Sequence, residues 1–117
     1  MKEIVYYRKE NWKIPIKLII NFLKENNPKI LAKLYYKLDL LKFNLLWIND
    51  IKYLKEWIYE LRIKENSNII RTFYFLYNWD EIILIDWFIK KDNKLKSSIL
   101  NKVIKYKKDY LKRIWLL

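Results

Sequence analysis

Hydrophobic spacing in the first half of the chain predicts one strand followed by two helices. Residues 4–8 form a β-branched and aromatic run, which is typical of a strand and which we expect to lie inside a sheet. Apolar residues then recur at helical spacing within residues 14–24. The Asn-Asn-Pro sequence at 26–28 ends this helix and begins another, because proline is favoured in a first helical turn. The second helix is expected to end near Leu46, which completes a helical hairpin.

In the second half the period changes from helical to two. Residues 57–63 alternate, residues 69–77 and 81–89 form two further strand-like runs, and short polar breaks separate the three. This pattern predicts a three-stranded antiparallel meander. Helical spacing returns from Leu95 onward. The order of strand, helical hairpin, three-stranded meander and C-terminal helix predicts an α+β fold, in one domain over residues 1–117.

Composition narrows the chemistry that the chain can perform. Its 117 residues include no cysteine, histidine or glycine. Without cysteine there is no disulfide and no thiolate nucleophile, and without histidine the commonest general base and metal ligand is missing. Without glycine the phosphate-binding loops of nucleotide-binding folds cannot form. We therefore expect neither a metal nor a small-molecule cofactor.

The charge balance points to a polyanionic partner. Lysine and arginine number 25 against 13 acidic residues, a formal net charge of +12. Residues 87–117 hold ten of these cations and two carboxylates, so most of the excess lies in the last quarter of the chain. The alternative is compositional drift, since a chain rich in Lys, Asn, Ile, Tyr and Phe is also what an AT-rich genome produces.

The hydrophobic runs are short. None approaches the roughly 18 residues that a membrane-spanning helix needs, and the amino terminus lacks the pattern of a signal peptide. We therefore expect a soluble cytoplasmic protein without a membrane partner.

Three stretches of the second half carry motifs in a recognisable order. Residues 58–63 read IYELRI, residues 70–75 read IRTFYF, and residues 82–91 read IILIDWFIKK. Together they resemble the HigB-like branch of the RelE toxin superfamily, in which a "YELR" strand, an "YRvfYf" strand, a strand ending in "KK" and a lysine-rich helix follow one another. The similarity covers roughly residues 50–113.

This resemblance implies a RelE-like fold and the toxin of a type II toxin–antitoxin pair. Such toxins enter the ribosomal A site and cleave messenger RNA without a metal, by transferring the 2′-hydroxyl onto the adjacent phosphate. The implied partners are messenger RNA, the ribosome and a helix-turn-helix antitoxin. This chemistry needs a cation beside the phosphate, a base for the 2′-hydroxyl and an acid for the leaving 5′-oxygen.

Four residues are the candidates for catalysis. Arg62 and Arg71 match the family motif and are two of only four arginines among the 25 cations, so we expect them to bind the scissile phosphate from one exposed, concave sheet face. Asp86 and Tyr74 are the candidates for proton transfer. On this hypothesis Arg71→Ala abolishes activity and leaves the fold intact. The alternative is structural, an ion pair of Arg62 with Glu60 or of Arg71 with Asp86.

A second group of residues is expected to hold the RNA backbone. It begins with the double lysine that matches the family's "KK" and continues along the last helix, where a solvated helix face is the alternative. Trp87 is added as a stacking residue, although aromatic residues on strands more often belong to a core. The lysines are Lys90, Lys91, Lys94, Lys96, Lys105 and Lys108.

The chain departs from the family pattern at one position that bears on catalysis. The family often has His-Gly where this chain has Asp86-Trp87, so a carboxylate replaces a potential acid or base. A carboxylate beside a phosphate can act as a base or can repel the substrate. The second hypothesis is therefore a non-catalytic binding protein on the same scaffold, such as a phage-encoded inhibitor of a nucleic-acid enzyme.

Overall fold

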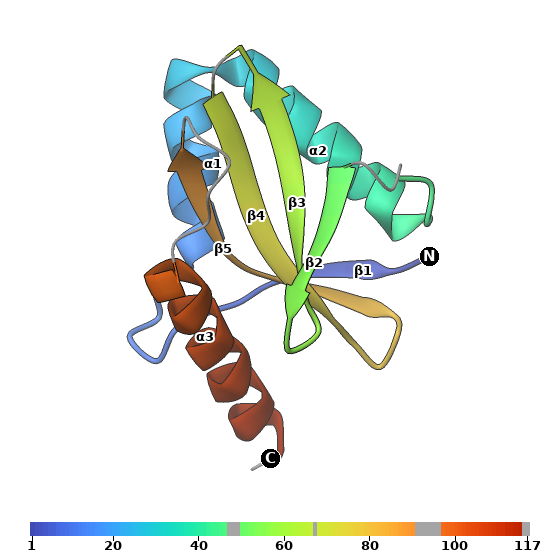
Figure 1. Ribbon diagram of the computed structural model, residues 1–117, viewed down its shortest axis with the longest axis vertical. Coiled ribbons are helices and arrows are strands. Elements are labelled where there is room, and N and C mark those ends of the chain that lie inside the picture. Colours follow the sequence, from blue (N-terminus) through green and yellow to red (C-terminus); the bar gives the residue numbers. More distant parts are fainter. Residues whose placement is uncertain (47–49, 67, 91–96, 116–117) are drawn as a thin grey trace.

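The fold is built around one five-stranded sheet (Figure 1). The computed structural model describes residues 1–46, 50–66, 68–90 and 97–115, except for the side chain of Lys90. The helices and strands confirm the predicted α+β class and its order. They are β1 (Glu3–Tyr6), α1 (Pro15–Asn26), α2 (Pro28–Lys42), β2 (Ile51–Lys55), β3 (Ile58–Glu65), β4 (Asn68–Tyr77), β5 (Glu81–Lys90) and α3 (Ser97–Trp115).

The strands lie in the order β1-β5-β4-β3-β2, and β2 to β5 form an antiparallel meander. The meander therefore has one strand more than predicted. Three of the five residues of β2 are exposed and two are lysines, so this edge strand shows no hydrophobic alternation. The expected position of β1 inside the sheet is wrong, because it pairs in parallel with β5 alone, over the four residues from Glu3 to Tyr6. β1 is thus the opposite edge.

α1 and α2 cover one face of the sheet, as the hairpin prediction required. Their buried residues include Ile16, Ile19 and Leu34, which pack in one cluster with Leu61 and Ile82 of the sheet. Figure 1 draws β3, β4 and β5 in front of these two helices. The cluster forms because the apolar stripe of each helix meets the apolar side of the strands, which removes both from water.

α2 ends four residues before the predicted Leu46, and the reason lies at Asn44. Asn44 has φ of 57° and donates its backbone N–H to the Leu41 carbonyl, while the Leu45 N–H bonds to the Leu40 carbonyl. These two bonds and the left-handed residue form a Schellman cap, which terminates a helix. Asparagine takes the place of the usual glycine, which this chain lacks.

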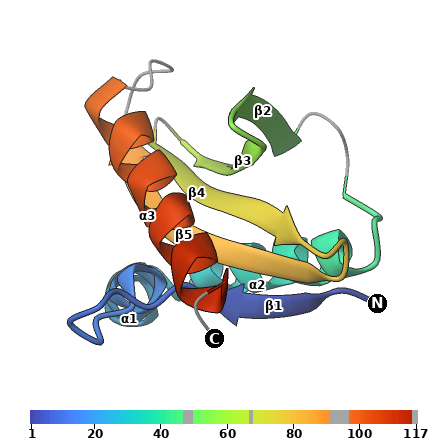
Figure 2. The same ribbon diagram turned by 90° about the horizontal axis from the view of Figure 1, so that it is seen from below.

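α3 packs on the other face of the sheet. Val103 is its buried residue, and it lies in a cluster with Phe73, Phe75, Ile83 and Ile85. Figure 2 shows α3 crossing in front of one end of β4 and β5. Polar side chains farther along β3 and β4 lie on this same face, beyond the end that α3 crosses.

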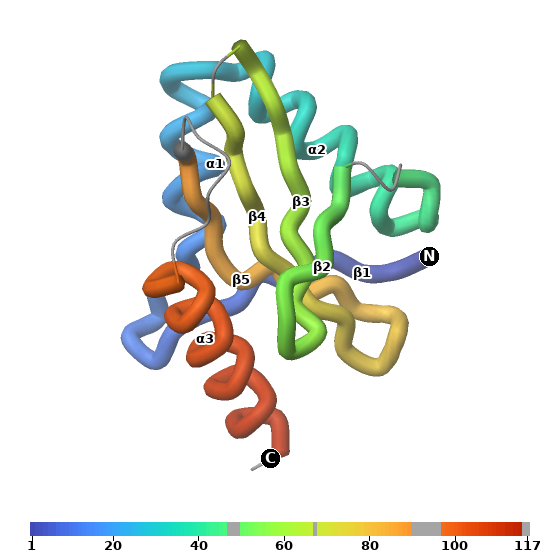
Figure 3. Tube along the Cα trace, viewed as in Figure 1, coloured from blue at the N-terminus to red at the C-terminus, as the bar shows by residue number. Residues whose placement is uncertain are grey.

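Two hairpin turns lie at the lower end of the sheet in Figure 3, and both place a tryptophan in the left-handed region. Glu56 and Trp57 have φ of 57° and 60°, and Asn78 and Trp79 have φ of 52° and 65°. Such turns match the twist of paired strands, and glycine normally occupies them. Because the chain has no glycine, bulky residues take the left-handed conformation in these two turns.

We expect Trp79→Gly to be more stable than Trp79→Ala by about 1 kcal/mol, because a Cβ atom in the left-handed region costs about that much and glycine has none. The ring itself is 81% exposed, so its loss removes little buried surface. Urea unfolding of the two variants measures the difference. Equal midpoints would show that the turn relaxes out of the left-handed region at no cost.

Candidate functional site

The sheet register places the polar candidates in two neighbouring rows. Across three adjacent strands, Glu60 pairs with Phe73, which pairs with Asp86. The next row consists of Arg62, Arg71 and Phe88. Both rows lie on the face that carries α3, because Phe73 belongs to the cluster around Val103. Strand spacing puts Glu60 and Asp86 about 10 Å apart.

Glu60 joins the two arginines through a single oxygen. Arg62 Nε lies 2.5 Å and Arg71 Nη1 2.6 Å from Glu60 Oε1. The side chains of Glu60 and Arg71 are fully buried, whereas that of Arg62 is 21% exposed. The Arg62–Glu60 ion pair named as the structural alternative is present. The expected exposure of Arg71 is wrong. Its side chain lies on the central strand β4, is fully buried and pairs with the buried carboxylate of Glu60.

Asp86 also has a cationic partner, supplied by α3. Its Oδ2 lies 3.1 Å from Lys102 Nζ, and its Oδ1 accepts the backbone N–H of Trp87 at 2.9 Å. The Asp86 side chain is 8% exposed and that of Lys102 is 49% exposed. Sequence reasoning missed Lys102. The available signal was its place directly before Val103, on the side of α3 that meets the sheet.

Tyr74 and Trp87 lie on the opposite face, and so do not join these rows. Tyr74 is buried in the cluster beneath α1 and α2, where its ring stacks on Tyr59 at 5.5 Å. Burial raises the pKa of the Tyr74 hydroxyl, which keeps its proton. The half-buried Trp87 donates its indole N–H to the Pro15 carbonyl at 2.9 Å. The proton-transfer role expected of Tyr74 is incompatible with this position.

The lysines expected to bind RNA are placed only in part. Lys105 and Lys108 are exposed on α3, as expected. The side chain of Lys90, and Lys91, Lys94 and Lys96, lie outside the described residues. Among the residues described, no group of three or more carboxylates is placed to hold a metal ion, and no helix within those ranges is long and apolar enough to cross a membrane.

A hydrogen-bonded cluster anchors α3 to the end of β1. Tyr7, directly after β1, donates its hydroxyl to Asp109 Oδ2 at 2.6 Å, and Arg113 reaches the same oxygen at 2.5 Å. Arg113 also donates to the backbone carbonyl of Arg8. Burial, and then the bond to Asp109, raise the pKa of Tyr7, so the hydroxyl stays a donor. This cluster fixes the helix that supplies Lys102.

We expect Asp109→Asn to destabilise the protein at neutral pH and to have less effect in acid. Burial alone would raise the pKa of Asp109, but the hydrogen bonds from Tyr7 and Arg113 and the arginine's charge lower it below 3.8. A carboxylate with a lowered folded-state pKa stabilises the protein above its unfolded pKa and loses this effect as the pH falls through the folded value. Urea unfolding at about pH 7 and pH 3 measures, at each pH, the difference in unfolding free energy between the variant and the wild type. A difference that is the same at both pH values would contradict the role of the charge.

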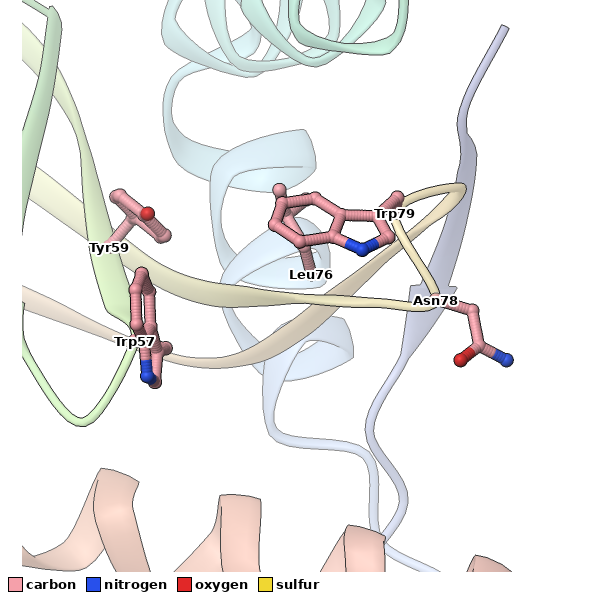
Figure 4. Close-up of a pocket in the computed structure, with 5 residues that line it drawn as sticks. All are labelled: Trp57, Tyr59, Leu76, Asn78 and Trp79. Carbon is pink, nitrogen blue, oxygen red and sulfur yellow. The ribbon is translucent and has the colours of Figure 1, made fainter.

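A hollow of about 330 Å³ opens on the face that α1 and α2 cover, at the end where the hairpin turns lie. Figure 4 shows Trp57 and Tyr59 on one side of it and Leu76 and Trp79 on the other. Trp57 and Trp79 are 68% and 81% exposed. Sequence reasoning did not single out these two tryptophans: it placed Trp57 in the strand that begins at Ile58, and the position of Trp79 between two predicted strands was a signal that it is exposed.

A family model described as "Phage derived protein Gp49-like" matches residues 21–108, about three quarters of the chain. The matched region holds both carboxylates of the two rows, both arginines and Lys102. No curated protein matches the chain.

Proposed function

The chain belongs to the Gp49-like family of phage-derived proteins, a toxin-like family of the RelE/HigB type, and from this premise we propose that it is the toxin of a type II toxin–antitoxin pair. Its activity is the cleavage of messenger RNA on the ribosome, by transfer of the 2′-hydroxyl onto the adjacent phosphate. Its partners are the ribosomal A site with its message and a helix-turn-helix antitoxin. The site of action is the cytoplasm.

One observation carries the proposal. On the face of the sheet that α3 shares, two buried carboxylates are each paired with a cation that reaches the surface, Glu60 with Arg62 and Asp86 with Lys102. A phosphate arriving from solvent meets the cations first. Charge-assisted hydrogen bonds from such cations stabilise a phosphorane, on which negative charge increases.

The roles follow from exposure and charge. Arg62 binds the scissile phosphate through its guanidinium fork, and Lys102 approaches the same group from α3. Asp86, released from Lys102 by the phosphate, takes the proton of the 2′-hydroxyl. The 2′-oxygen then bonds to phosphorus and the bond to the 5′-oxygen breaks, with a proton returned to that oxygen. Arg71, being buried, acts on Glu60 and not on the substrate.

The proposal is tested by expressing the chain and mapping the ends of ribosome-bound messages by primer extension. Growth arrest, together with cuts that depend on translation, is the expected result. Absence of both, combined with tight binding to a protein partner, would contradict the toxin assignment. The alternative of a non-catalytic inhibitor would then replace it.

Asp86→Asn separates the two possible effects of this carboxylate. If Asp86 is the base, its amide cannot take the proton, and cleavage falls by about two to four decades. The amide keeps the shape of the side chain, so binding of a 2′-O-methyl RNA stays within about threefold. Cleavage at the wild-type rate, with tighter RNA binding, would show that Asp86 only repels phosphate.

A further inference from the structure

β5 is paired with β1 along only the first part of its length. β1 accompanies β5 only as far as the pair of Tyr6 with Leu84, whereas β5 continues to Lys90. A hollow of about 380 Å³ lies beside this second part, between the start of α1 and α3. Its walls combine cations with aromatic rings. Among the residues that line it are Lys9, Lys13, Asp86, Lys102, Trp87 and Tyr106.

The charge of this hollow favours an anion. Of the described residues that line it, three are lysines and Asp86 is the one carboxylate. Asp86 is paired with Lys102 at 3.1 Å, so the charges of Lys9 and Lys13 remain in excess. The neighbouring Glu10 lines a second hollow, to which Lys9 and Tyr106 also contribute, and is not among the residues that line this one. A phosphate group is the anion that lysines commonly bind in this way.

The two excess lysines are held side by side by the loop that carries them. Lys9 donates its backbone N–H to the Lys13 carbonyl at 2.9 Å, and the Trp12 N–H bonds to the Lys9 carbonyl at 3.0 Å. Asn11 Oδ1 accepts the Lys13 N–H at 3.1 Å. Trp12 takes the left-handed conformation with φ of 70°, and its ring lies 4.0 Å from the guanidinium of Arg8. A loop ordered in advance lowers the entropy lost on binding.

The aromatic wall is also fixed in place. Trp87 is anchored by its hydrogen bond to the Pro15 carbonyl, and Tyr106 stacks on Tyr7 with ring centroids 5.1 Å apart. Lys9 Nζ lies 5.6 Å from the Tyr106 ring centroid. Lysines that bind phosphate beside rings that stack on a base are the combination by which proteins hold single-stranded nucleic acid.

We propose that this hollow binds one nucleotide of single-stranded RNA, with its phosphate on Lys9 and Lys13 and its base against Trp87 and Tyr106. The inference rests on the proposed function, because Asp86 and Lys102 belong both to the hollow and to the cleavage site. The bound nucleotide is therefore a neighbour of the scissile one on the same strand. A plain anion site would need the lysines alone and would not use the rings.

Fluorescence anisotropy with a short 2′-O-methyl oligouridylate tests the lysines, since this probe cannot be cleaved. Lys9→Gln/Lys13→Gln is expected to weaken binding about tenfold and to flatten the log–log salt dependence by about 1.4, the value for two lost contacts to a single strand. The matched control, Lys29→Gln/Lys33→Gln, removes the same charge from exposed positions of α2. Equal losses in both variants would overturn the proposal.

Two further probes test the base. A 4-thiouridine probe of the same length should crosslink on irradiation to Trp87 or Tyr106, as mass spectrometry of the peptides would show. An abasic probe keeps its phosphates, so it should bind the wild type more weakly than the RNA does and should still lose affinity in the Lys9/Lys13 variant. Crosslinks at Trp57 or Trp79 instead, or equal binding of abasic probe and RNA, would overturn the nucleotide assignment.

Growth arrest separates this inference from the function on which it rests. If the wild type arrests growth while the Lys9/Lys13 variant binds RNA normally, the inference fails and the proposed toxin stands. If the wild type does not arrest growth but RNA binding depends on Lys9, Lys13 and the base, the cleavage activity fails and the nucleotide site stands.

Discussion

Replacing Arg71 with alanine is expected to lower the free energy of unfolding by about 3 kcal/mol, the lower end of the cost of breaking a buried ion pair on one side, because the partly exposed Arg62 still reaches Glu60 Oε1. Arg71 and Glu60 are both fully buried and lie 2.6 Å apart. Glu60 Oε2 has no hydrogen-bond partner in the described part of the chain, so the carboxylate depends on the cations at Oε1. Urea unfolding followed by circular dichroism measures the loss.

The double variant Glu60→Leu/Arg71→Met is the matched control. It removes both charges and fills the space with apolar groups, so it should recover most of the lost stability. A single Arg71→Ala variant that unfolds at the wild-type midpoint would contradict the buried pair. The expectation that Arg71→Ala leaves the fold intact is thus corrected, and a loss of activity in that variant would not identify a phosphate ligand.

Arg62→Ala is expected to lower the rate of message cleavage by two to three decades, about the effect of removing one donor that faces developing negative charge. Its effect on stability should stay within about 1 kcal/mol, because the Arg62 side chain is partly exposed and Arg71 still pairs with Glu60. Primer extension on ribosome-bound message gives the rate, and urea unfolding of the same preparation gives the stability.

Two further variants serve as controls for the cleavage rate of Arg62→Ala. Arg62→Lys keeps the charge and loses the planar fork, and so should restore part of the rate. Lys33→Ala removes an exposed cation from α2, on the far side of the sheet, and should leave the rate unchanged. Full growth arrest by Arg62→Ala would exclude Arg62 as the phosphate ligand.

Patterns within the sequence were enough to predict the kind and order of most elements. The strands expected over 69–77 and 81–89 match β4 and β5 to within one residue at either end, and Asn26-Asn27-Pro28 marks the join of α1 and α2. These features are local, since hydrophobic period, turn residues and a proline all act within a few neighbouring residues. The motifs in β3, β4 and β5 also pointed to the RelE/HigB type, the toxin-like type to which the matching Gp49-like family belongs.

Which side chains meet depends on how the elements pack, and this could not be predicted from the sequence. Edge strands such as β2 are held by pairing with a neighbour and carry no alternation of their own. That Arg71 is buried against Glu60, that Asp86 pairs with Lys102, and that Lys9 faces Tyr106 all depend on residues 11 to 97 positions apart. The free energy of such contacts arises from desolvation and charge pairing between elements, and no pattern within one element specifies the partner. The sequence therefore indicated the strands that carry the candidate residues, whereas burial and pairing in the folded chain leave Arg62 and Lys102 at the surface and Arg71 inside.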